Sequence, residues 1–347
     1  MLPNVSPWRL SVAPMMGWTD RHCRYFHRLL TRHTLLYTEM VTTGALIHGN
    51  AAQHLHFNTE EHPVALQLGG SDPADLAACA QLAQQRGYDE VNLNCGCPSE
   101  RVLRGAFGAC LMADAALVRD GIKAMLDVVD IPVTVKHRIG IDKVESYDFV
   151  RDFVGTVADS GCRVFLVHAR NAWLQGLSPK ENREIPPLRY EWVYQLKRDF
   201  PHLSIAINGG ITTNEQIAQH LSQLDGVMIG REAYHNPWLM VDWDRQFYAD
   251  DTRPTPSREA VELAMVAYME RAAQEDGAPW YAVACHMLGL RHGLPGARKW
   301  RQVWSDHRLK PLPPREVWAL AQAHVRPAAE ASSPEIFSTV ALSTPSI

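Results

Sequence analysis

The chain has 347 residues, of which 46% are hydrophobic, and a formal net charge of −4 at pH 7. This length exceeds one ordinary domain and fits an α/β barrel of roughly 250 residues with a smaller second domain. The charge excludes a globally basic nucleic-acid-binding protein, so any RNA-binding surface has to be a local basic patch. Seven cysteines without framework spacing, no apolar leader and no apolar run of membrane-spanning length predict a cytoplasmic protein.

Short apolar strands alternate with amphipathic helices along the first part of the chain. The strand-like runs cover residues 10–13, 35–40, 64–68, 90–94, 133–137, 164–168, 204–208 and 226–229. Helical patterns lie between most of them, at residues 21–30, 74–85, 115–128, 147–159 and 214–223. Eight repeats of this alternation predict a (β/α)8 TIM barrel, class α/β, over residues 1–245. The irregular segments 43–58 and 169–187 are expected to form its active-site rim.

A small all-helical domain is predicted for residues 255–325. The polar, proline-bearing connector 250–256 ends the alternation, and Ser257 is a candidate N-cap. Beyond it the periodicity is helical only, at residues 259–275, 280–290, 296–305 and 315–324. Residues 326–347 are rich in Ala, Ser, Pro and Thr without periodicity, so we expect a disordered tail.

The most informative segment is residues 92–99, which read NLNCGCPS at the end of the fourth strand. Pro98 stiffens the turn after Cys97, and a thiol just beyond a strand end stands where an α/β barrel keeps its chemistry. A buried structural thiol is the usual alternative. A zinc site at Cys95 and Cys97 would need a second ligand pair, and none is near in sequence. Cys110, on the same rim loop, is interpreted as a packing residue, and so is Cys285 in the helical domain.

Two glycine-bearing strand ends predict a phosphate site. Gly209 and Gly210 follow Asn208 at the seventh strand, while Gly230 and Arg231 follow the eighth. Barrels commonly bind phosphate with these two loops, and glycine lets backbone N–H groups approach an anion closely. Tight turns would explain either loop alone, but the pair at matching strands favours phosphate.

Polar residues at other strand ends suit one planar flavin. Gln67, Lys136 and His168 lie at the ends of the third, fifth and sixth strands, and the first strand is followed by Pro14, Met15 and Met16. Gln and Lys can bond the pyrimidine-like edge of an isoalloxazine ring, and a cation near N1 stabilises the reduced flavin. Each residue alone would be an ordinary satisfied side chain, so the prediction rests on their joint placement.

Three further rim residues are candidates. Asn94 ends the fourth strand and offers an amide to a pyrimidine edge. We expect Glu39, at the end of the second strand, to pair with a rim cation, and Arg138 to contact substrate.

The helical domain carries a basic cluster with two interleaved tryptophans. Basic residues with aromatics indicate an RNA-backbone surface, and an ordinary solvated helix face is the alternative. The cluster comprises Arg291, Arg298, Lys299, Arg301, Arg308 and Lys310 with Trp300 and Trp304.

With these motifs the chain resembles the bacterial tRNA-dihydrouridine synthases, most closely their A subfamily. The segments that carry the resemblance are 13–20, 64–70, 92–99, 134–140, 167–170, 207–210 and 229–231. Segments 176–183 and 185–188 resemble the rim loop of the A subfamily, and the resemblance covers about residues 5–325.

The resemblance implies reduction of uridines 20 and 20a in the tRNA D-loop to 5,6-dihydrouridine, with FMN as cofactor and NADPH as reductant. It implies hydride transfer from FMN N5 to C6 and protonation of C5 by Cys97, a role open to a thiol at neutral pH. The implied FMN contacts are Pro14, Met15, Met16, Gln67, Lys136, His168, Asn208, Gly209, Gly210, Gly230 and Arg231. The implied tRNA contacts are Asn94, Arg183, Pro186, Arg298 and Arg301. We expect a monomer without metal.

Two rival interpretations remain. An FMN barrel that reduces a free small molecule, of the dihydroorotate or ene-reductase type, would leave the basic helical domain unexplained. A tRNA-binding protein without catalysis would have a damaged flavin site or lack Cys97, and neither is seen in the sequence.

Overall fold

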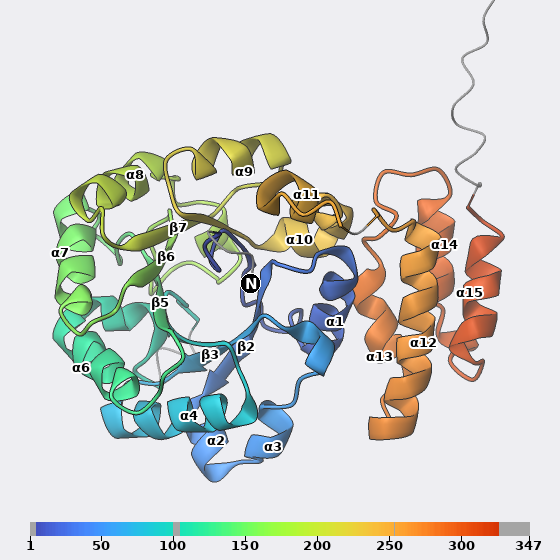
Figure 1. Ribbon diagram of the computed structural model, residues 1–347, viewed down its shortest axis with the longest axis horizontal. Coiled ribbons are helices and arrows are strands. Elements are labelled where there is room, and N and C mark those ends of the chain that lie inside the picture. The colour runs from blue at the N-terminus through green and yellow to red at the C-terminus, as the bar shows by residue number, and fades with distance from the viewer. Residues whose placement is uncertain (1–4, 100–104, 253, 326–347) are drawn as a thin grey trace, which may run out of the picture.

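Eight parallel strands close into a barrel in chain order, with β1 paired to both β2 and β8 (Figure 1). The computed structural model describes residues 5–99, 105–252 and 254–325. The strands are β1 (Leu10–Val12), β2 (Leu35–Thr42), β3 (Val64–Gly69), β4 (Glu90–Cys95), β5 (Val133–Arg138), β6 (Val164–His168), β7 (Ser204–Asn208) and β8 (Gly226–Ile229). The predicted TIM barrel is confirmed, and each predicted strand lies within two residues of its observed bounds. The predicted tail, residues 326–347, lies outside the described residues.

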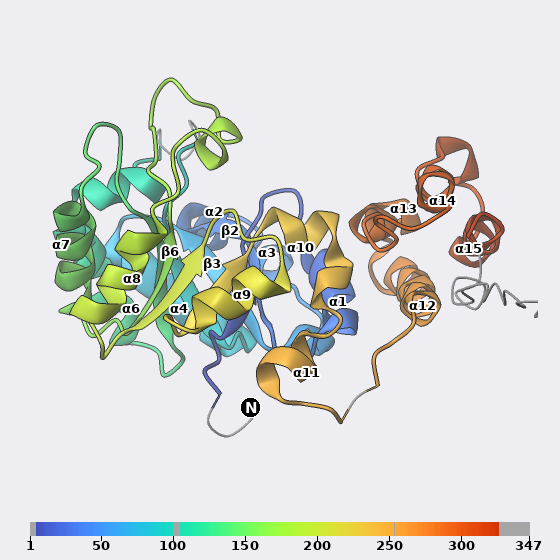
Figure 2. The ribbon, with the colours of Figure 1, turned by 90° about the horizontal axis from the view of Figure 1, so that it is seen from above.

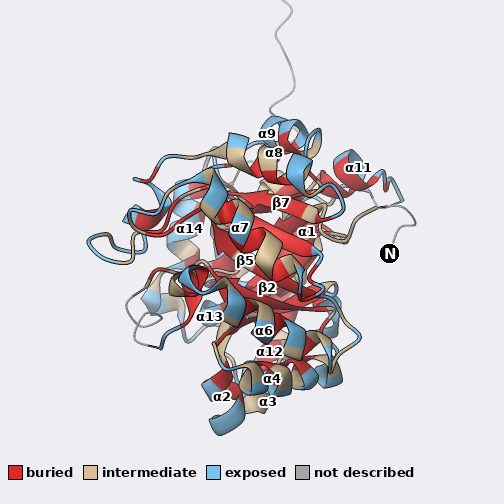
Figure 3. Ribbon diagram, turned by 90° about the vertical axis from the view of Figure 1, so that its left-hand side faces the viewer, coloured by how far each residue is buried: buried red, intermediate tan, exposed pale blue. Residues whose placement is uncertain are grey.

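Helices surround the barrel, with one face buried against the strands and another exposed (Figure 3). They are α1 (Arg21–Leu30), α2 (Thr43–His48), α3 (Ala51–His54), α4 (Pro73–Arg86), α6 (Ala115–Leu126), α7 (Tyr147–Ala158), α8 (Tyr190–Asp199), α9 (Asn214–Leu221), α10 (Arg231–His235) and α11 (Trp243–Tyr248). Short 3-10 turns lie at η1 (Thr59–Glu61), η2 (Gly108–Ala113), η3 (Glu181–Arg183) and η4 (Pro237–Met240). The segment 43–58, expected to be irregular, holds α2 and α3, because Thr42 and Asn50 cap their first turns.

Two apolar layers hold the barrel together. The larger layer lies between strands and helices and continues into the C-terminal helices. The smaller layer gathers residues from six strands or strand ends: Ala13, Leu35, Tyr37, Ala65, Leu166, Ala206 and Met228. Because successive side chains of a strand point to opposite faces, this second layer fills the barrel interior.

The strand β2 carries an irregularity that re-aims its C-terminal half. Its pairing with β3 shifts register between Tyr37 and Met40, and the Thr38 hydroxyl accepts the Gln67 backbone N–H at 3.0 Å in the gap. Bulges of this kind redirect side chains at barrel rims. Here the irregularity lies beside Gln67, a predicted cofactor residue.

A C-terminal helical region, residues 254–325, packs beside the barrel. Its elements are α12 (Arg258–Asp276), α13 (Trp280–Ala284), η5 (Cys285–Met287), α14 (Ala297–Trp304), η6 (His307–Leu309) and α15 (Pro314–Gln322). Ser257 caps α12 as predicted, because its Oγ accepts the Ala260 N–H at 3.1 Å. The helix predicted for residues 280–290 is shorter than expected. Gly289 packs its backbone against α10, where an added Cβ would lie 2.6 Å from the His235 carbonyl oxygen.

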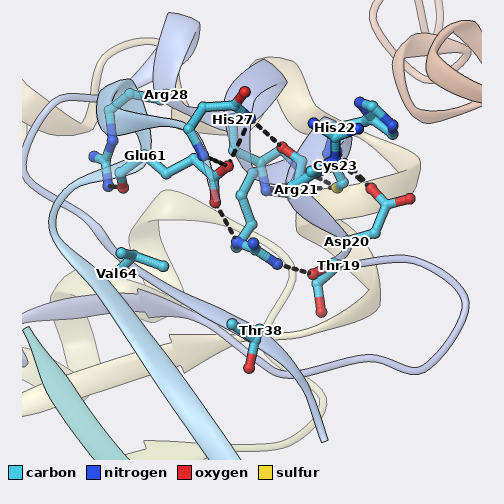
Figure 4. A network of polar contacts seen from close by, with 12 residues as sticks. Thr19, Asp20, Arg21, His22, Cys23, His27, Arg28, Thr38, Glu61 and Val64 are labelled. Carbon is cyan, nitrogen blue, oxygen red and sulfur yellow. Dashed lines mark hydrogen bonds and ion pairs between the residues drawn. The ribbon is translucent and has the colours of Figure 1, made fainter. Parts of the chain in front are cut away.

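The helical region contacts the barrel mainly through α1 and the segments near it (Figures 1 and 2). Asp20 caps α1 by accepting the His22 and Cys23 backbone N–H groups at 2.9 and 3.0 Å (Figure 4). From the helical region, His286 Nε2 approaches Asp20 at 3.2 Å, and Tyr268 donates to or accepts from His22 Nδ1 at 2.7 Å. Polar contacts on one helix therefore join the two parts. None of the described helices has the length and apolarity to cross a bilayer.

Candidate active site

Residues 96–99, called the Cys97 loop below, follow the end of β4 at Cys95. Hydrogen bonds to their backbone groups hold this loop in place. Asn94 Oδ1 accepts the backbone N–H groups of Gly96 and Cys97, each at 3.0 Å. The Cys97 carbonyl accepts the Ala109 N–H at 2.9 Å. The thiol itself is half-buried, with Sγ 3.4 Å from Ser99 Oγ. The loop holds one thiol at the barrel end where enzymes of this fold carry their catalytic groups.

The other cysteines have different surroundings. Cys95 is fully buried, and burial raises the pKa of its thiol. Cys110 packs in η2 with its Sγ 3.1 Å from the Phe107 carbonyl oxygen. The expectation that Cys285 is a core residue is wrong, because His286 and Met287 take the buried positions of η5 and leave Cys285 exposed. Among the described residues, no group of three or more His, Cys, Asp or Glu side chains is placed to hold a metal.

Gln67 lies in a fully buried row of amides that reaches the Cys97 loop. Its Nε2 donates to Asn92 Oδ1 at 2.7 Å, and its Oε1 accepts from Asn94 Nδ2 at 2.8 Å. Lys136 is the register partner of Asn94 on β5, and His168 is the partner of Asn208 on β7. The predicted residues of β3, β4, β5, β6 and β7 therefore meet at one end of the barrel.

The rim is strongly cationic. His168 is buried, and burial together with Arg138, Lys136, Arg170 and Arg183 holds its pKa well below the usual value. Burial, with Arg138 adding to it, lowers the pKa of Lys136 to about 7. Lys136 forms no ion pair or hydrogen bond with another side chain in the part of the chain that is described. Such a group gains from an incoming anion.

The glycine loop after β7 has the geometry that the phosphate prediction requires. Gly209 and Gly210 have φ of +118° and +72°, where side chains are strained. A Cβ at Gly209 would lie 2.8 Å from His168 Cδ2, and one at Gly210 would lie 2.7 Å from Leu188 Cδ1. The Tyr190 hydroxyl donates to the Gly209 carbonyl at 2.6 Å. The loop is therefore fixed, and its lack of side chains leaves backbone N–H groups open.

The loop after β8 differs from this. Gly230 precedes α10 with a negative φ of −99°, unlike Gly209 and Gly210. Its nearest would-be Cβ contact is the Ala13 Cβ at 3.9 Å. The Arg231 guanidinium forms an ion pair with Glu184 at 2.6 Å. In the loop after β8, Gly230 therefore borders open space, and Arg231 is held by Glu184 from the loop after β6.

Two rim segments complete the predicted set. After β1, the Met15 N–H donates to Thr19 Oγ1 at 2.9 Å, whereas the Met16 side chain is 61% exposed. In the loop after β6, Arg183 is exposed, and Pro186 is buried with its carbonyl bonded by Arg170. Pro14, which follows β1, is partly buried.

Arg138 and Glu39 have protein partners that the sequence did not indicate. Arg138 is 3% exposed, and its guanidinium donates to the carbonyls of Gly96 at 3.0 Å, Asn171 at 3.0 Å and Asn182 at 2.8 Å. It ties the Cys97 loop to the loop after β6, and the expected contact of Arg138 with substrate stays a prediction. Glu39 accepts the backbone N–H of Gly17 and pairs with no cation among the described residues.

The basic cluster of the helical region is smaller than predicted. Arg291 is buried and bonded to Glu262 at 2.5 Å, Arg308 pairs with Asp306 at 2.6 Å, and Lys310 lies over the Tyr281 ring at 4.0 Å. The tryptophans form the core of the region, with Trp300 at 0% and Trp304 at 2% exposure. Amphipathic packing turns them inward, so they do not interleave with the surface cations. Arg308 and Lys310 are exposed as well, but each is engaged by a neighbouring side chain, which leaves Arg298, Lys299 and Arg301 on α14 as the exposed cations of the cluster without such a partner among the described residues.

The buried residues Glu90, Asn92 and Thr134 were not singled out from the sequence. They continue the amide row of Gln67 and Asn94 down the barrel interior. The signal was present, because polar residues at 90, 92 and 94 alternate within a strand expected to be buried. In a barrel that alternation places polar groups inside.

The chain is similar to known proteins over most of its length. A family model described as dihydrouridine synthase (Dus) matches residues 11–317. The chain is 61% identical over 304 residues to a tRNA-dihydrouridine(20/20a) synthase of Salmonella typhi, covering 87% of this chain and 91% of the relative. It is 61% identical over 304 residues to the tRNA-dihydrouridine(20/20a) synthase of Escherichia coli (strain K12), covering 87% of each chain. A solved structure of a 2-naphthoyl-CoA reductase complex aligns with 73% of this chain and with 51% of the reductase chain, with a TM-score of 0.53 and 11% identity. This likeness shows the fold alone.

Proposed function

The chain belongs to the dihydrouridine synthase family and is an oxidoreductase, and we propose that it reduces uridines 20 and 20a of tRNA to 5,6-dihydrouridine with FMN and NADPH. One observation carries the proposal. A single half-buried thiol, Cys97, is tied to a cationic barrel mouth where Gln67, Lys136 and His168 meet beside the Gly209 loop. Relatives over 87% of the chain are named for this activity on tRNA.

The residues at the mouth fit FMN. The positive φ values and close packing of Gly209 and Gly210 leave a side-chain-free edge suited to a phosphate. Lys136, which lacks a carboxylate partner among the described residues, suits the negative charge of a reduced flavin. The residues proposed to hold the cofactor are Pro14, Met15, Met16, Gln67, Lys136, His168, Asn208, Gly209, Gly210, Gly230 and Arg231. No dinucleotide fingerprint accompanies this cradle, which favours FMN over FAD.

The reaction adds two hydrogens across the C5–C6 double bond of uracil. When bound and reduced, FMN supplies the hydride that adds to C6. Cys97 gives its thiol proton to C5 from the opposite face of the ring, and solvent then returns a proton to the sulfur. The hydrogen bonds of Asn94 and Arg138 to the Cys97 loop hold the sulfur in place for this step. NADPH provides the two electrons for each turnover.

Two separate surfaces are proposed to hold the tRNA. Asn94, at the end of β4, and Arg183 and Pro186, in the loop after β6, are proposed to contact the uridine. Arg298 and Arg301 lie on α14, one helical turn apart, and suit backbone phosphates. A uridine in a tertiary loop is extracted from its stack at low cost.

The test uses the purified holoprotein. Released cofactor is identified by chromatography, the protein is reduced with NADPH without oxygen, and it is then mixed with tRNA that lacks dihydrouridine. We expect FMN, oxidation of the reduced flavin by tRNA, and new dihydrouridine at positions 20 and 20a. FAD in the extract, or a colourless protein that FMN cannot reconstitute, would contradict the cofactor proposal. Oxidation by small enones but not by tRNA would instead support the small-molecule reductase.

A further inference from the structure

A chain of buried hydrogen bonds runs along the barrel interior from Glu90 to the Cys97 loop. Thr134 Oγ1 donates to Glu90 Oε1 at 2.5 Å and accepts from Asn92 Nδ2 at 2.8 Å. Asn92 Oδ1 accepts from Gln67, Gln67 Oε1 accepts from Asn94, and Asn94 Oδ1 accepts the two loop N–H groups. These five side chains come from β3, β4 and β5, and each is at most 8% exposed.

Chemistry dictates the direction of every bond in this chain. At one end, the Glu90 carboxylate can only accept hydrogen bonds, so the Thr134 hydroxyl has to donate its single hydrogen to Glu90. Thr134 can then only accept a hydrogen bond from Asn92. At the other end, the N–H groups of Gly96 and Cys97 only donate, so Asn94 has to present its oxygen to them. Both ends demand the same orientation of the Asn92, Gln67 and Asn94 amides, as the distances show.

Glu90 is well suited to remain a carboxylate. Besides Thr134, the Tyr37 hydroxyl and the Trp8 Nε1–H donate to it, each at 2.6 Å. Burial raises the pKa of Glu90 to about 7, with these three donors opposing the rise. At pH 8 the carboxyl is therefore mostly ionised, and the direction of the chain is imposed.

Packing alone does not require this arrangement. Apolar side chains such as Leu166, Ala206 and Met228 fill another part of the barrel interior. A buried carboxylate costs free energy that an apolar side chain of similar volume would not. The polar chain runs only beneath the Cys97 loop and Gln67, the parts proposed to act on flavin and uridine.

We propose that Glu90 is a positioning residue that sets the amide orientation of Gln67 and Asn94, and through Asn94 the geometry of the Cys97 loop. In this orientation the oxygens of both amides are engaged by protein donors. The hydrogen that remains on each NH2 group is left for a ligand. Gln67 and Asn94 therefore select ring edges that carry carbonyl oxygens, as the flavin and uracil pyrimidine rings do. The ligand part of this inference rests on the proposed function, whereas the loop part does not.

The experiment interrupts the hydrogen-bond chain at two residues, Glu90 and Thr134, in the holoprotein at pH 8. Glu90→Gln puts an NH2 donor where only an acceptor stood, so a second set of amide orientations competes with the first. Thr134→Val removes the link while Thr134→Ser keeps its hydroxyl. Glu61→Gln is the matched control, since Glu61 is another fully buried carboxylate (Figure 4). Its side chain is bonded to Arg24 at 2.6 Å and to Asn58, and to no member of the Glu90 chain among the described residues.

Two quantities are measured on each folded variant: the FMN dissociation constant, and the rate of Cys97 alkylation by iodoacetamide, followed by mass spectrometry. We expect both to rise about fivefold in Glu90→Gln and Thr134→Val, the shift that corresponds to one neutral hydrogen bond. Thr134→Ser should stay within about twofold of the wild type by the same measure. Glu61→Gln should lower the melting temperature and leave both quantities unchanged.

Several outcomes would overturn the inference. One is unchanged FMN binding and Cys97 alkylation in Glu90→Gln and Thr134→Val, and another is an equal shift in Glu61→Gln. If Glu90→Gln does not fold, the Thr134→Val and Thr134→Ser pair decides alone. A wild-type protein that binds no FMN would contradict the proposed function, while the alkylation rates would still test the role of Glu90.

Discussion

The barrel mouth and the helical region both present arginines, but they hold them differently. At the mouth, Arg138 is buried and donates to three backbone carbonyls, and Arg170 bonds the Pro186 carbonyl. On α14, Arg298 and Arg301 are exposed and have no hydrogen-bond or ion-pair partner in the described part of the chain. The bonded arginines shape a site, whereas the unbonded arginines are available to a ligand.

This difference matches the needs of the two surfaces. A reaction at one carbon of one base requires groups fixed within a fraction of an ångström, which buried hydrogen bonds provide. Binding a phosphate backbone requires charge at a suitable spacing, which exposed side chains provide at lower precision. We therefore expect damage at the mouth to affect chemistry or cofactor, and damage on α14 to affect only tRNA affinity.

The largest effect is expected for Cys97→Ala. The variant should retain FMN and still be reduced by NADPH, because neither step uses the thiol. Oxidation of the pre-reduced enzyme by tRNA should slow by about 10² or more, the usual scale for a lost general acid. Single-turnover absorbance of the flavin measures this rate, and Cys110→Ala is the matched control. A wild-type rate in Cys97→Ala would remove Cys97 from the mechanism.

Gly209→Ala should separate cofactor binding from the rest of the site. Its Cβ would lie 2.8 Å from His168 Cδ2 at a φ of +118°, so the loop has to move. We expect FMN affinity to fall about tenfold or more, in proportion to the strain of such a position. Gly161→Ala is the control, because its φ is +101° but the nearest contact is 3.5 Å away, at Leu126. Equal FMN titrations for the two variants would show that the β7 loop does not hold the cofactor.

The double variant Arg298→Ala and Arg301→Ala tests the exposed cations. We expect tRNA to bind roughly tenfold more weakly, with a salt dependence reduced by about one for each lost phosphate contact. Reduction of FMN by NADPH should be unchanged. Arg308→Ala is the control, since its guanidinium is already paired with Asp306 at 2.6 Å. Binding isotherms at several salt concentrations decide, and an unchanged slope would make α14 an ordinary solvated face.

The smallest effect concerns the contact between the two regions. Burial alone would lower the pKa of His286, but its hydrogen bonds to Asp20 and Cys23 outweigh burial and raise it above 6.5. Burial would likewise raise the pKa of Asp20, but the hydrogen bond and charge of His286 lower it from 3.8 to about 2. The charged pair of Asp20 and His286 therefore stabilises the fold most between pH 3.8 and pH 6.5, the ordinary pKa values of the two side chains. Its contribution declines as pH rises above 6.5, where the unfolded chain no longer holds the histidine proton.

His286→Asn should lower the free energy of unfolding by about 1 kcal/mol near pH 5.5, a modest value because Asp20 is partly exposed. The difference from the wild type should shrink toward pH 9. Urea unfolding at the two pH values measures it, with the exposed His307→Asn as control. A difference that grew with pH would show that the histidine is neutral in the folded protein.

Much of the architecture was predictable because it depends on local patterns. Alternating apolar strands and amphipathic helices identified all eight strands, and Ser257 marked the start of α12. Cys97 and the glycine loops were found by their place after strands, since parallel strands bring their ends together. The cofactor and tRNA roles of the individual site residues stay predictions.

The errors have a common origin in long-range contacts. Arg291 and Arg298 look alike in the sequence, but Glu262, 29 residues before Arg291, holds only the first of them inside. The sequence likewise did not indicate the carbonyls that engage Arg138, which lie 33 and 44 residues further along the chain. A periodic pattern shows which face of a helix is buried, and it contains no information about which partner will stand opposite.

By itself, the sequence determined the barrel, the helical region and the strand ends that carry the polar residues, because these follow from the spacing of apolar residues and turns. Only the tertiary structure decided which polar groups are bonded to one another. Closure of the barrel brings β3, β4 and β5 side by side, and only then can Glu90 direct a chain of hydrogen bonds toward Cys97. The physical reason is that a buried polar group must find its partner wherever the fold places one, whatever their separation in sequence.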